Sequence, residues 1–223
     1  MNLLQPGIAV DLETGEVRVR RILGLNPGPM TGPGTNTYLV GSDELTLIDP
    51  GPIDALQLQN FLVAIGDATL VNILVTHTHG DHSPGALALA KQTGARLVGL
   101  NAPQAPGQDH SFVSDIECAD GDIIECRDTA GSYSLQMIHT PGHVSNHLCF
   151  LLREEGLLFT GDHVLQGTTP VILPPDGDMS DYLASLERLL KLPLVALAPA
   201  HGDVMPAPFT EIEKLIAHRL KRE

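Results

Sequence analysis

Residues 77–82 concentrate side chains that bind metal ions, because three histidines and one aspartate occupy six positions directly after an apolar run. His77 and His79 are two residues apart, so in an extended segment their side chains point the same way and can share one metal. The glycine that follows lets the chain turn, so that Asp81 and His82 can face a second metal. A buried structural histidine explains one of these positions but not all four, so the motif predicts a metal site.

Three further candidate ligands, each beside a glycine and each in a loop after an apolar segment, are His143, Asp162 and His201. The enlarged set is sufficient for two metals. Two cations about 3.5–4 Å apart lower the pKa of a shared water, so that metal-bound hydroxide attacks a carbonyl or phosphoryl centre at neutral pH. Imidazoles and carboxylates without a thiolate favour two zinc ions, with manganese or iron as alternatives. Such a net cationic pair attracts a small anionic or acyl substrate.

The composition is that of an ordinary globular chain, with 43% hydrophobic and 18% charged residues over 223 positions. A net charge of −14 and the absence of tryptophan disfavour a surface that holds a polyanion or stacks bases. Three cysteines do not suggest a disulfide framework. No apolar run is long enough to cross a bilayer and the amino terminus does not resemble a signal peptide, so we expect a cytoplasmic protein without membrane contact.

Apolar strand-like runs alternate with helical patterns along the chain, and no linker interrupts them. We expect strands at residues 37–40, 45–48, 71–76, 96–100, 123–126, 135–138, 148–152, 157–160 and 195–198, and helices at 55–65, 83–94, 181–190 and 210–220. Ser83 and Thr210 are expected to cap two of these helices. The alternation predicts an α/β fold in which helices flank two packed sheets, as a single domain over residues 1–223 with a C-terminal helix within 203–223.

The order HxHxDH, then His, Asp and His, resembles the metallo-β-lactamase superfamily over residues 24–202. The resemblance implies an αββα sandwich, the metallo-β-lactamase fold. It also implies that one metal is held by His77, His79 and His143, and the other by Asp81, His82 and His201. Asp162 would bridge both metals, Asp81 and Asp162 would be the catalytic carboxylates, and Asp49 would orient a ligand without binding metal.

Details of the sequence narrow this resemblance. Asp162 stands where the cysteine-ligated secreted β-lactamases have Cys, and His79 stands where diiron flavoproteins have Glu, so a site of the glyoxalase II or tRNase Z type fits better. Residues 26–31 and 34–39 look like the β-lactamase-like protein 2 family, which in animals includes an endoribonuclease for single-stranded RNA. By that resemblance the candidate substrate-binding residues are Asn36, Tyr38, Thr168 and Thr169, although turn formation and packing explain them equally well.

Other polar residues near the motif have simpler interpretations. His139 and His147 flank His143, where orienting a ligand and packing at a strand end are equally plausible. His163 follows Asp162, and alternation points it away from the metals, which favours a structural role. Two more histidines suit the surface, and two aspartates suit helix capping: His110, His218, Asp178 and Asp181.

Four functions are compatible with this reading. The first is a dinuclear-zinc hydrolase of a small ester or thioester, favoured by the acidity and the scarcity of aromatic residues. The second is a single-stranded RNA endonuclease, which would make RNA a partner. The third is a mononuclear-iron sulfur dioxygenase, and the fourth is an inactive metal-binding module, disfavoured by the intact ligand set. The apolar stripe of the last helix leaves a homodimer as an alternative to a monomer.

Overall fold

The computed structural model describes residues 4–129 and 131–221. A seven-stranded sheet has the order β1-β2-β3-β4-β5-β6-β7, antiparallel from β1 to β4 and parallel from β4 to β7. Its strands are β1 (Ala9–Asp11), β2 (Val19–Leu23), β3 (Asn36–Val40), β4 (Glu44–Ile48), β5 (Thr69–Leu74), β6 (Arg96–Gly99) and β7 (Ile116–Glu117).

The second sheet has five strands in the order β12-β11-β10-β9-β8, in which only the β11–β12 pair is parallel. Its strands are β8 (Ile123–Cys126), β9 (Tyr133–His139), β10 (Leu148–Leu152), β11 (Leu157–Gly161) and β12 (Ala196–Pro199). β10 and β11 are buried along their whole length, as expected for strands covered on both faces.

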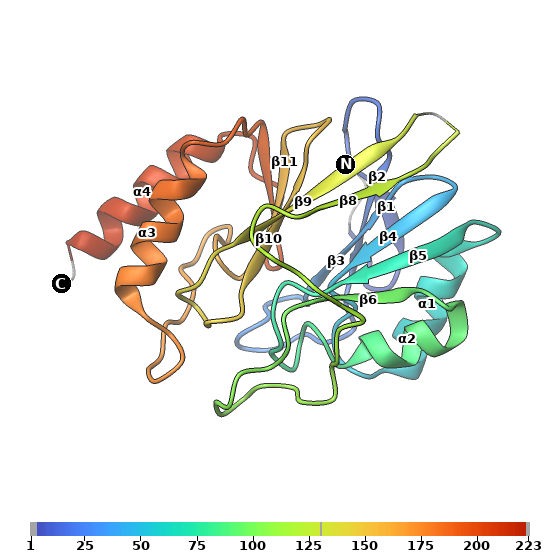
Figure 1. Ribbon diagram of the computed structural model, residues 1–223, viewed down its shortest axis with the longest axis horizontal. Coiled ribbons are helices and arrows are strands. Elements are labelled where there is room, and N and C mark those ends of the chain that lie inside the picture. Colours follow the sequence, from blue (N-terminus) through green and yellow to red (C-terminus); the bar gives the residue numbers. More distant parts are fainter. Residues whose placement is uncertain (1–3, 130, 222–223) are drawn as a thin grey trace.

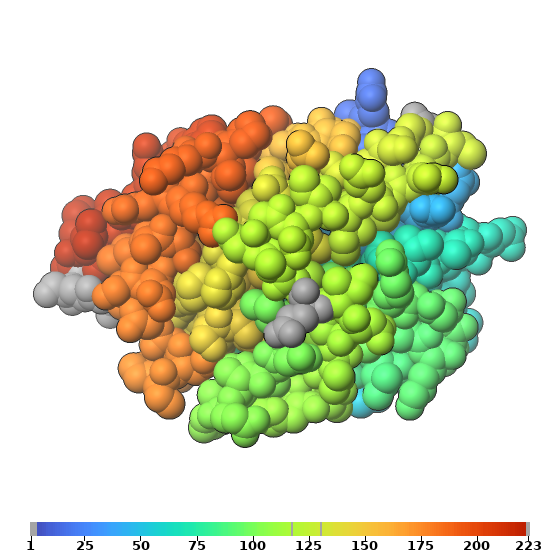
Figure 2. Space-filling model, in the orientation of Figure 1, coloured from blue at the N-terminus to red at the C-terminus, as the bar shows by residue number. Residues whose placement is uncertain are grey.

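Helices cover the outer face of each sheet (Figure 1). α1 (Ala55–Ile65) and α2 (Gly85–Thr93) pack on the first sheet, and α3 (Met179–Leu189) and α4 (Pro208–Leu220) pack on the second. A third apolar cluster, which includes Tyr38, Phe150 and Phe159, fills the space between the sheets. Figure 2 shows the same layers filled, from the orange and red helices to the blue-green and green ones. The predicted αββα sandwich is therefore confirmed.

Helix boundaries agree with the sequence in part. α1 has the predicted bounds, and Gly94 ends α2 in the left-handed conformation that glycine adopts easily. Two predicted caps are wrong. The hydroxyl of Ser83 donates to Asp109, and α2 begins after Pro84 without a side-chain cap. α4 begins at Pro208, two residues before Thr210, because proline is well suited to the first turn of a helix.

The strands β1, β2 and β7 were not expected from the sequence. In β2 the basic residues Arg20 and Arg21 interrupt the apolar alternation. Arg20 is nevertheless buried, because its guanidinium donates to the carbonyl oxygen of Ala64 at the end of α1. No helix among the described residues is long and apolar enough to cross a membrane.

Candidate metal centre

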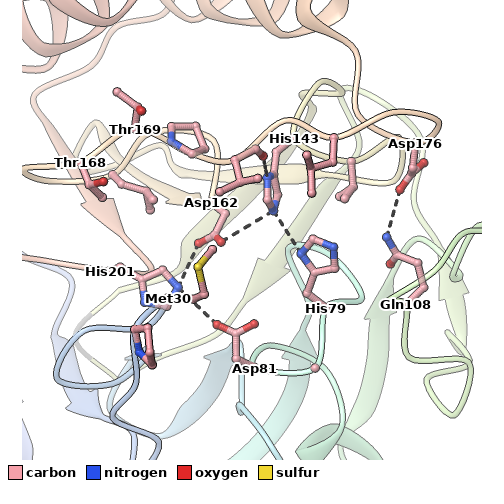
Figure 3. A pocket seen from close by; sticks show the side chains of 18 of the residues that line it. Met30, His79, Asp81, Gln108, His143, Asp162, Thr168, Thr169, Asp176 and His201 are labelled. Carbon is pink, nitrogen blue, oxygen red and sulfur yellow. Dashed lines mark hydrogen bonds and ion pairs between the residues drawn. The ribbon is translucent and has the colours of Figure 1, made fainter.

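The seven predicted ligands lie together at one edge of the sandwich, in loops that follow strands of both sheets. Figure 3 shows those that line the cavity: His79, Asp81, His143, Asp162 and His201. His77, His79, Asp81 and His82 follow β5 of the first sheet. The others follow β9, β11 and β12 of the second sheet: His143, Asp162 and His201. The segments are joined at the sheet ends, because the N–H of Leu148 donates to the carbonyl oxygen of Thr76.

One group of ligands consists of three histidines. The Nε2 atom of His77 lies 3.0 Å from Nδ1 of His79, and Nε2 of His143 lies 3.1 Å from the same Nδ1. Ligands around a tetrahedral zinc ion, each at about 2.0–2.1 Å, lie roughly 3.3 Å from one another. The three ring nitrogens are thus spaced as ligands of one ion.

A second group consists of one carboxylate and two histidines. Oδ2 of Asp81 lies 3.4 Å from Nε2 of His82 and 3.3 Å from Nε2 of His201. Thr35 donates its hydroxyl to the same carboxylate oxygen, at 3.2 Å, which holds Asp81 in this orientation. This group has the donor set of a second site for a divalent cation.

Asp162 lies between the two groups. Its Oδ1 atom is 3.6 Å from Nε2 of His82 and 3.3 Å from Nε2 of His201, while Oδ2 is 3.7 Å from Nε2 of His143. The two oxygens of one carboxylate therefore face different groups, as Figure 3 shows for His143 and His201. This is the arrangement expected of a bridging ligand.

Several observations show that a metal pair fits these residues. Nε2 of His82 and Oδ1 of Asp162 are buried without a hydrogen-bond partner, although both face the centre of the cluster. Leaving buried polar atoms unpaired is costly, and a cation would compensate both. The opposite ring nitrogens of two ligands are also engaged, since His82 Nδ1 pairs with Asp49 and His143 Nδ1 with the carbonyl oxygen of Val171. Metal-binding histidines are usually oriented in this way.

Asp49 is the residue that joins these orienting contacts. Its Oδ1 accepts from the N–H of Thr76, and its Oδ2 accepts from the hydroxyl of Thr76 and from Nδ1 of His82, at 2.7–2.9 Å. The Thr76 hydroxyl oxygen also lies 3.1 Å from Nδ1 of His77. Asp49 is buried and has a φ of 54°, a conformation that non-glycine residues seldom adopt. Its contacts therefore reach one histidine of each group.

The two groups differ in their electrostatics. Burial, followed by repulsion from neighbouring histidines, lowers the pKa of His77 well below 6.5 and that of His79 to about 4, so both rings are neutral. Burial also opposes a charge on His82, yet the carboxylates of Asp81, Asp162 and Asp49 raise its pKa well above 6.5. The aspartate side of the site therefore attracts positive charge, whether as protons or as metal ions.

His147, whose role the sequence left open, contacts two of the three loops that carry ligands of the second sheet, those of His143 and Asp162. It is fully buried, its Nδ1 lies 2.9 Å from the hydroxyl of Thr140, and its Nε2 accepts from the backbone N–H of Asp162 at 3.2 Å. Gly161 permits this approach, because a Cβ there would lie 2.7 Å from Nε2 of His147. His147 therefore does more than pack at a strand end: its two ring nitrogens contact the loops of His143 and Asp162.

The predicted substrate-binding roles of Asn36 and Tyr38 need correction. Asn36 and Tyr38 are buried and do not line the cavity beside the ligands; Asn36 donates to the carbonyl oxygens of Pro199 and Gly202, and Tyr38 donates to that of Pro199. They hold the loop of His201 instead of facing a substrate. His163, for which the sequence favours a structural role, lies outside the ligand groups and is fully buried between His147 and Tyr182.

The other histidines and aspartates that the sequence analysis considered lie outside the two ligand groups. His110 and His218 are exposed, and the nitrogen Nε2 of His139 pairs with the carbonyl oxygen of Ser145. Asp178 caps α3 by accepting from the N–H of Asp181, as its position predicts.

A cavity of ≈ 530 Å³ opens above the ligands. Thr168 and Thr169 line it, as do His79, Asp81, His143, Asp162 and His201. The sequence did not identify the other residues of the wall, which is mainly apolar and is formed by several loops. They include Met30, Pro106, Gln108, Leu165, Pro170, Val171, Leu173 and Asp176. The feature that marks this wall is the exposure of its apolar side chains, 72% for Met30 and 69% for Leu173. The sequence alone does not show this exposure, because it depends on the folded structure.

Comparisons with known proteins agree with this site. The family model described as the metallo-beta-lactamase superfamily matches residues 30–201, which include every predicted ligand. The chain is similar to a beta-lactamase domain protein from Burkholderia ambifaria, with a TM-score of 0.79, 19% identity, and coverage of 99% of this chain and 76% of that one. At this identity the likeness concerns the fold.

Two curated relatives are similar in sequence. The chain is 35% identical to the beta-lactamase-like protein 2 homolog of Drosophila melanogaster, over 92% of this chain and 71% of the relative. It is 32% identical to the atrochrysone carboxyl ACP thioesterase of Claviceps purpurea, over 96% of this chain and 65% of the relative, so it spans less than two thirds of that protein. Together with the His and Asp clusters of a metal-dependent hydrolase, these matches show that the chain belongs to the metallo-beta-lactamase superfamily.

Proposed function

We propose that the chain is a dinuclear zinc hydrolase that cleaves acyl thioesters, and esters of similar shape, in the cavity above the two ligand groups. The observation that carries the proposal is the composition of this cavity. Its floor holds the imidazole and carboxylate ligands, its wall is mainly apolar, and no lysine or arginine of the described residues lines it. Such a wall suits an acyl chain, and such a floor suits hydrolysis of its carbonyl group.

The ligand assignment follows the two groups of side chains. In our proposal His77, His79 and His143 hold one ion, Asp81, His82 and His201 hold the other, and the oxygens of Asp162 contact both. When bound, a pair of divalent ions supplies hydroxide at neutral pH by lowering the pKa of a shared water, and offsets the negative charge that develops on the substrate. Asp81 and Asp162 line the cavity and supply the carboxylate charge that retains the ions.

Leu165, Thr168, Thr169, Val171 and Leu173, which also line the cavity, bind and orient the substrate. The apolar side chains of Leu165, Val171 and Leu173 exclude water from the acyl group, and the hydroxyls of Thr168 and Thr169 are available to its polar atoms. Hydrolysis adds water across the bond between the carbonyl carbon and sulfur. The products are a carboxylic acid, which loses its proton to solvent at neutral pH, and a free thiol.

The RNA endonuclease alternative of the sequence analysis finds less support. An RNA strand needs cations for its phosphates and aromatic rings for its bases, and the described part of the cavity wall has no lysine, arginine, tyrosine or phenylalanine. An acyl carrier protein (ACP) thioesterase from Claviceps purpurea is among the relatives, which favours thioester chemistry. We therefore extend the proposal to an acyl group borne by a carrier thiol.

The test is a substrate panel in which thiol release from an acyl thioester is compared with cleavage of single-stranded RNA at physiological salt. We expect thioester hydrolysis that is lost, by about 10³-fold or more, in Asp162→Ala, because that carboxylate contacts both groups of ligands. His163→Ala serves as the neighbouring control: it should retain most activity at low temperature, although truncating a buried ring destabilises the fold by about 3–5 kcal/mol if it behaves as other aromatic core residues do. RNA cleavage without thioester hydrolysis would refute the proposal.

A further inference from the structure

Asp176 is a carboxylate in the cavity wall that the proposed hydrolysis does not use. It is half-buried, and it lies in the segment before α3, on the side of the cavity that Figure 3 shows beyond His79 and His143. None of the ion pairs among the described residues includes it. Its negative charge therefore has no salt-bridge partner in the described part of the chain and faces the space that a substrate would fill.

Hydrogen bonds hold Asp176 in this place. Oδ2 accepts from the side-chain amide of Gln108 at 3.0 Å, and Oδ1 accepts from the N–H of Ser145 at 3.2 Å. Gln108 is itself fixed, because its Oε1 accepts from the hydroxyl of Thr78, within the metal motif, and Thr78 accepts from Asn146. The carboxylate is thus attached to the loop of residues 101–115 and to the loop that carries His143, and cannot easily swing away.

The contact between Gln108 and Asp176 also bounds this end of the cavity. It joins the loop of residues 101–115 to the segment of residues 165–178, so a substrate group that reaches this end meets two side chains bonded to each other. A thiol attached to a bulky carrier needs an open end. The geometry therefore assigns the bounded end to the acyl group.

Among the described residues, no lysine or arginine side chain lines this space to attract an anionic acyl group. Arg219 contacts the outside of the wall, but its guanidinium donates to the carbonyl oxygen of Pro170 and lies over the ring of Tyr182. On the segment that carries Asp176, the preceding residues that line the cavity include Val171 and Leu173, both apolar. A carboxylate on the acyl group would have to leave water, lie against these side chains and approach a like charge.

We propose that Asp176 is a specificity-determining residue that restricts the cavity to thioesters with an uncharged, apolar acyl group and rejects acyl groups that end in a carboxylate. The inference rests on the proposed thioesterase function and names its substrate class. A neutral chain buries its carbon atoms against Val171 and Leu173, whereas a dicarboxylic half-thioester meets repulsion at the bounded end.

The experiment compares hexanoyl and adipoyl thioesters of N-acetylcysteamine, which have acyl chains of equal carbon number and the same uncharged thiol. We expect kcat/KM of the zinc-loaded chain to favour hexanoyl by about 100-fold, the combined effect of desolvation and like-charge repulsion. In Asp176→Asn this preference should fall about tenfold, equivalent to about 1.4 kcal/mol, mainly through a lower KM for adipoyl. Hydrolysis of the hexanoyl substrate should change little.

Asp178→Asn is the matched control, since it removes the same charge two residues away at a helix cap outside the cavity wall. It should leave the preference unchanged. If Asp176→Asn is poorly folded, Asp176→Ser, which keeps a hydrogen-bond acceptor, takes its place. Absence of hexanoyl hydrolysis by the wild-type chain would refute the proposed function and this inference with it. Hydrolysis of both substrates with a preference that neither Asp176 variant alters would refute the inference alone.

Discussion

Asp49 connects the backbone of the metal motif to one ligand of each group, although we assign it to neither metal. Its carboxylate accepts three hydrogen bonds, two from Thr76 and one from Nδ1 of His82. The third bond keeps the proton of His82 on Nδ1 and leaves Nε2 free to face Asp81 and Asp162. A strained φ of 54° is retained at this position, which indicates that the contacts outweigh the backbone cost.

We expect Asp49→Asn to weaken metal binding by about 10–100-fold, the usual effect of removing such an orienting partner. The asparagine keeps one acceptor for the N–H of Thr76 but offers an amide in place of the oxygen that His82 contacts. Competition with a chelator of known zinc affinity measures the change. Asp54→Asn is the control, because Asp54 caps α1 and contacts no ligand. Equal zinc affinities in Asp49→Asn and the wild type would show that Asp49 only stabilises the loop.

At this scale the sequence predicts ligands better than it predicts substrate contacts. His77, His79, Asp81 and His82 are recognisable because four ligands in six residues form a local pattern. Asn36 and Tyr38 belong to an equally recognisable segment, yet they bond to the backbone of the His201 loop, a contact between residues far apart in the chain. The spacing of residues along the chain does not show whether a side chain at the end of a strand points into a cavity or towards a neighbouring loop.

Among the elements, α3 is fastened to the second sheet at both of its ends. At its start Asp178 caps the helix, and Gly142 lies so close that a Cβ there would be 2.3 Å from Cα of Tyr182. Near its end Arg188 donates to both oxygens of Asp120 at 2.7 Å and to the carbonyl oxygen of His139. The helix thereby supports the loop that carries His143.

The contact between Arg188 and Asp120 predicts a pH-dependent contribution to stability. Partial burial raises the pKa of Asp120, but hydrogen bonds from Arg188 and from the N–H of His139 lower it more, to below its ordinary value. A group whose folded pKa is depressed stabilises the fold above its unfolded pKa, near 3.9, and loses that effect as the pH falls. Because both side chains are more than 40% exposed, we expect a contribution of about 0.5–1 kcal/mol.

Urea unfolding of Asp120→Asn checks this expectation. The variant should be less stable than the wild type by that amount at pH 7, and the difference should shrink towards zero by about pH 3. Asp67→Asn is the control, because Asp67 is exposed and takes part in none of the ion pairs among the described residues. A difference that stays constant with pH would assign the effect to packing instead of charge.

The elements that the sequence predicted are those whose own residues carry the signal. The β10–β11 hairpin is a pair of apolar runs about a polar turn, and α1 has a periodic apolar face with an Asp54 cap. β2 is different, because the buried Arg20 donates a hydrogen bond to the carbonyl oxygen of Ala64 at the end of α1, a partner distant in sequence. Thr210 shows the opposite error: a good local cap was overruled by the earlier turn at Pro208.

For the whole molecule, the metal site lies where the two halves of the sandwich meet. Four ligands follow β5 of the first sheet, and three follow strands of the second. Without cations, one group consists of closely spaced neutral histidines. In the other group, the negative charges of the carboxylates raise the pKa of His82. Ions bound there would be held by both halves and would favour the assembled fold over the unfolded chain.

We therefore expect elemental analysis of the zinc-replete chain to give two ions per chain, and chelation to lower its melting temperature. Each ion present at a hundredfold excess over its Kd adds roughly 2.7 kcal/mol to the free energy of unfolding. For a chain of 223 residues, two such ions correspond to a decrease of roughly 10–20 °C when they are removed.

Adding zinc back should restore the melting temperature, whereas calcium, which prefers six to eight oxygen ligands, should not. Asp162→Ala separates a dinuclear site from two independent ones. The two oxygens of Asp162 face different ligand groups, Oδ1 towards His82 and His201 and Oδ2 towards His143. If each oxygen contacts one ion, the variant should lose most of the zinc-dependent stabilisation from both sites. A variant that still binds one ion with wild-type affinity would show that the groups act separately. One ion or none in the replete wild-type chain would refute the dinuclear assignment itself.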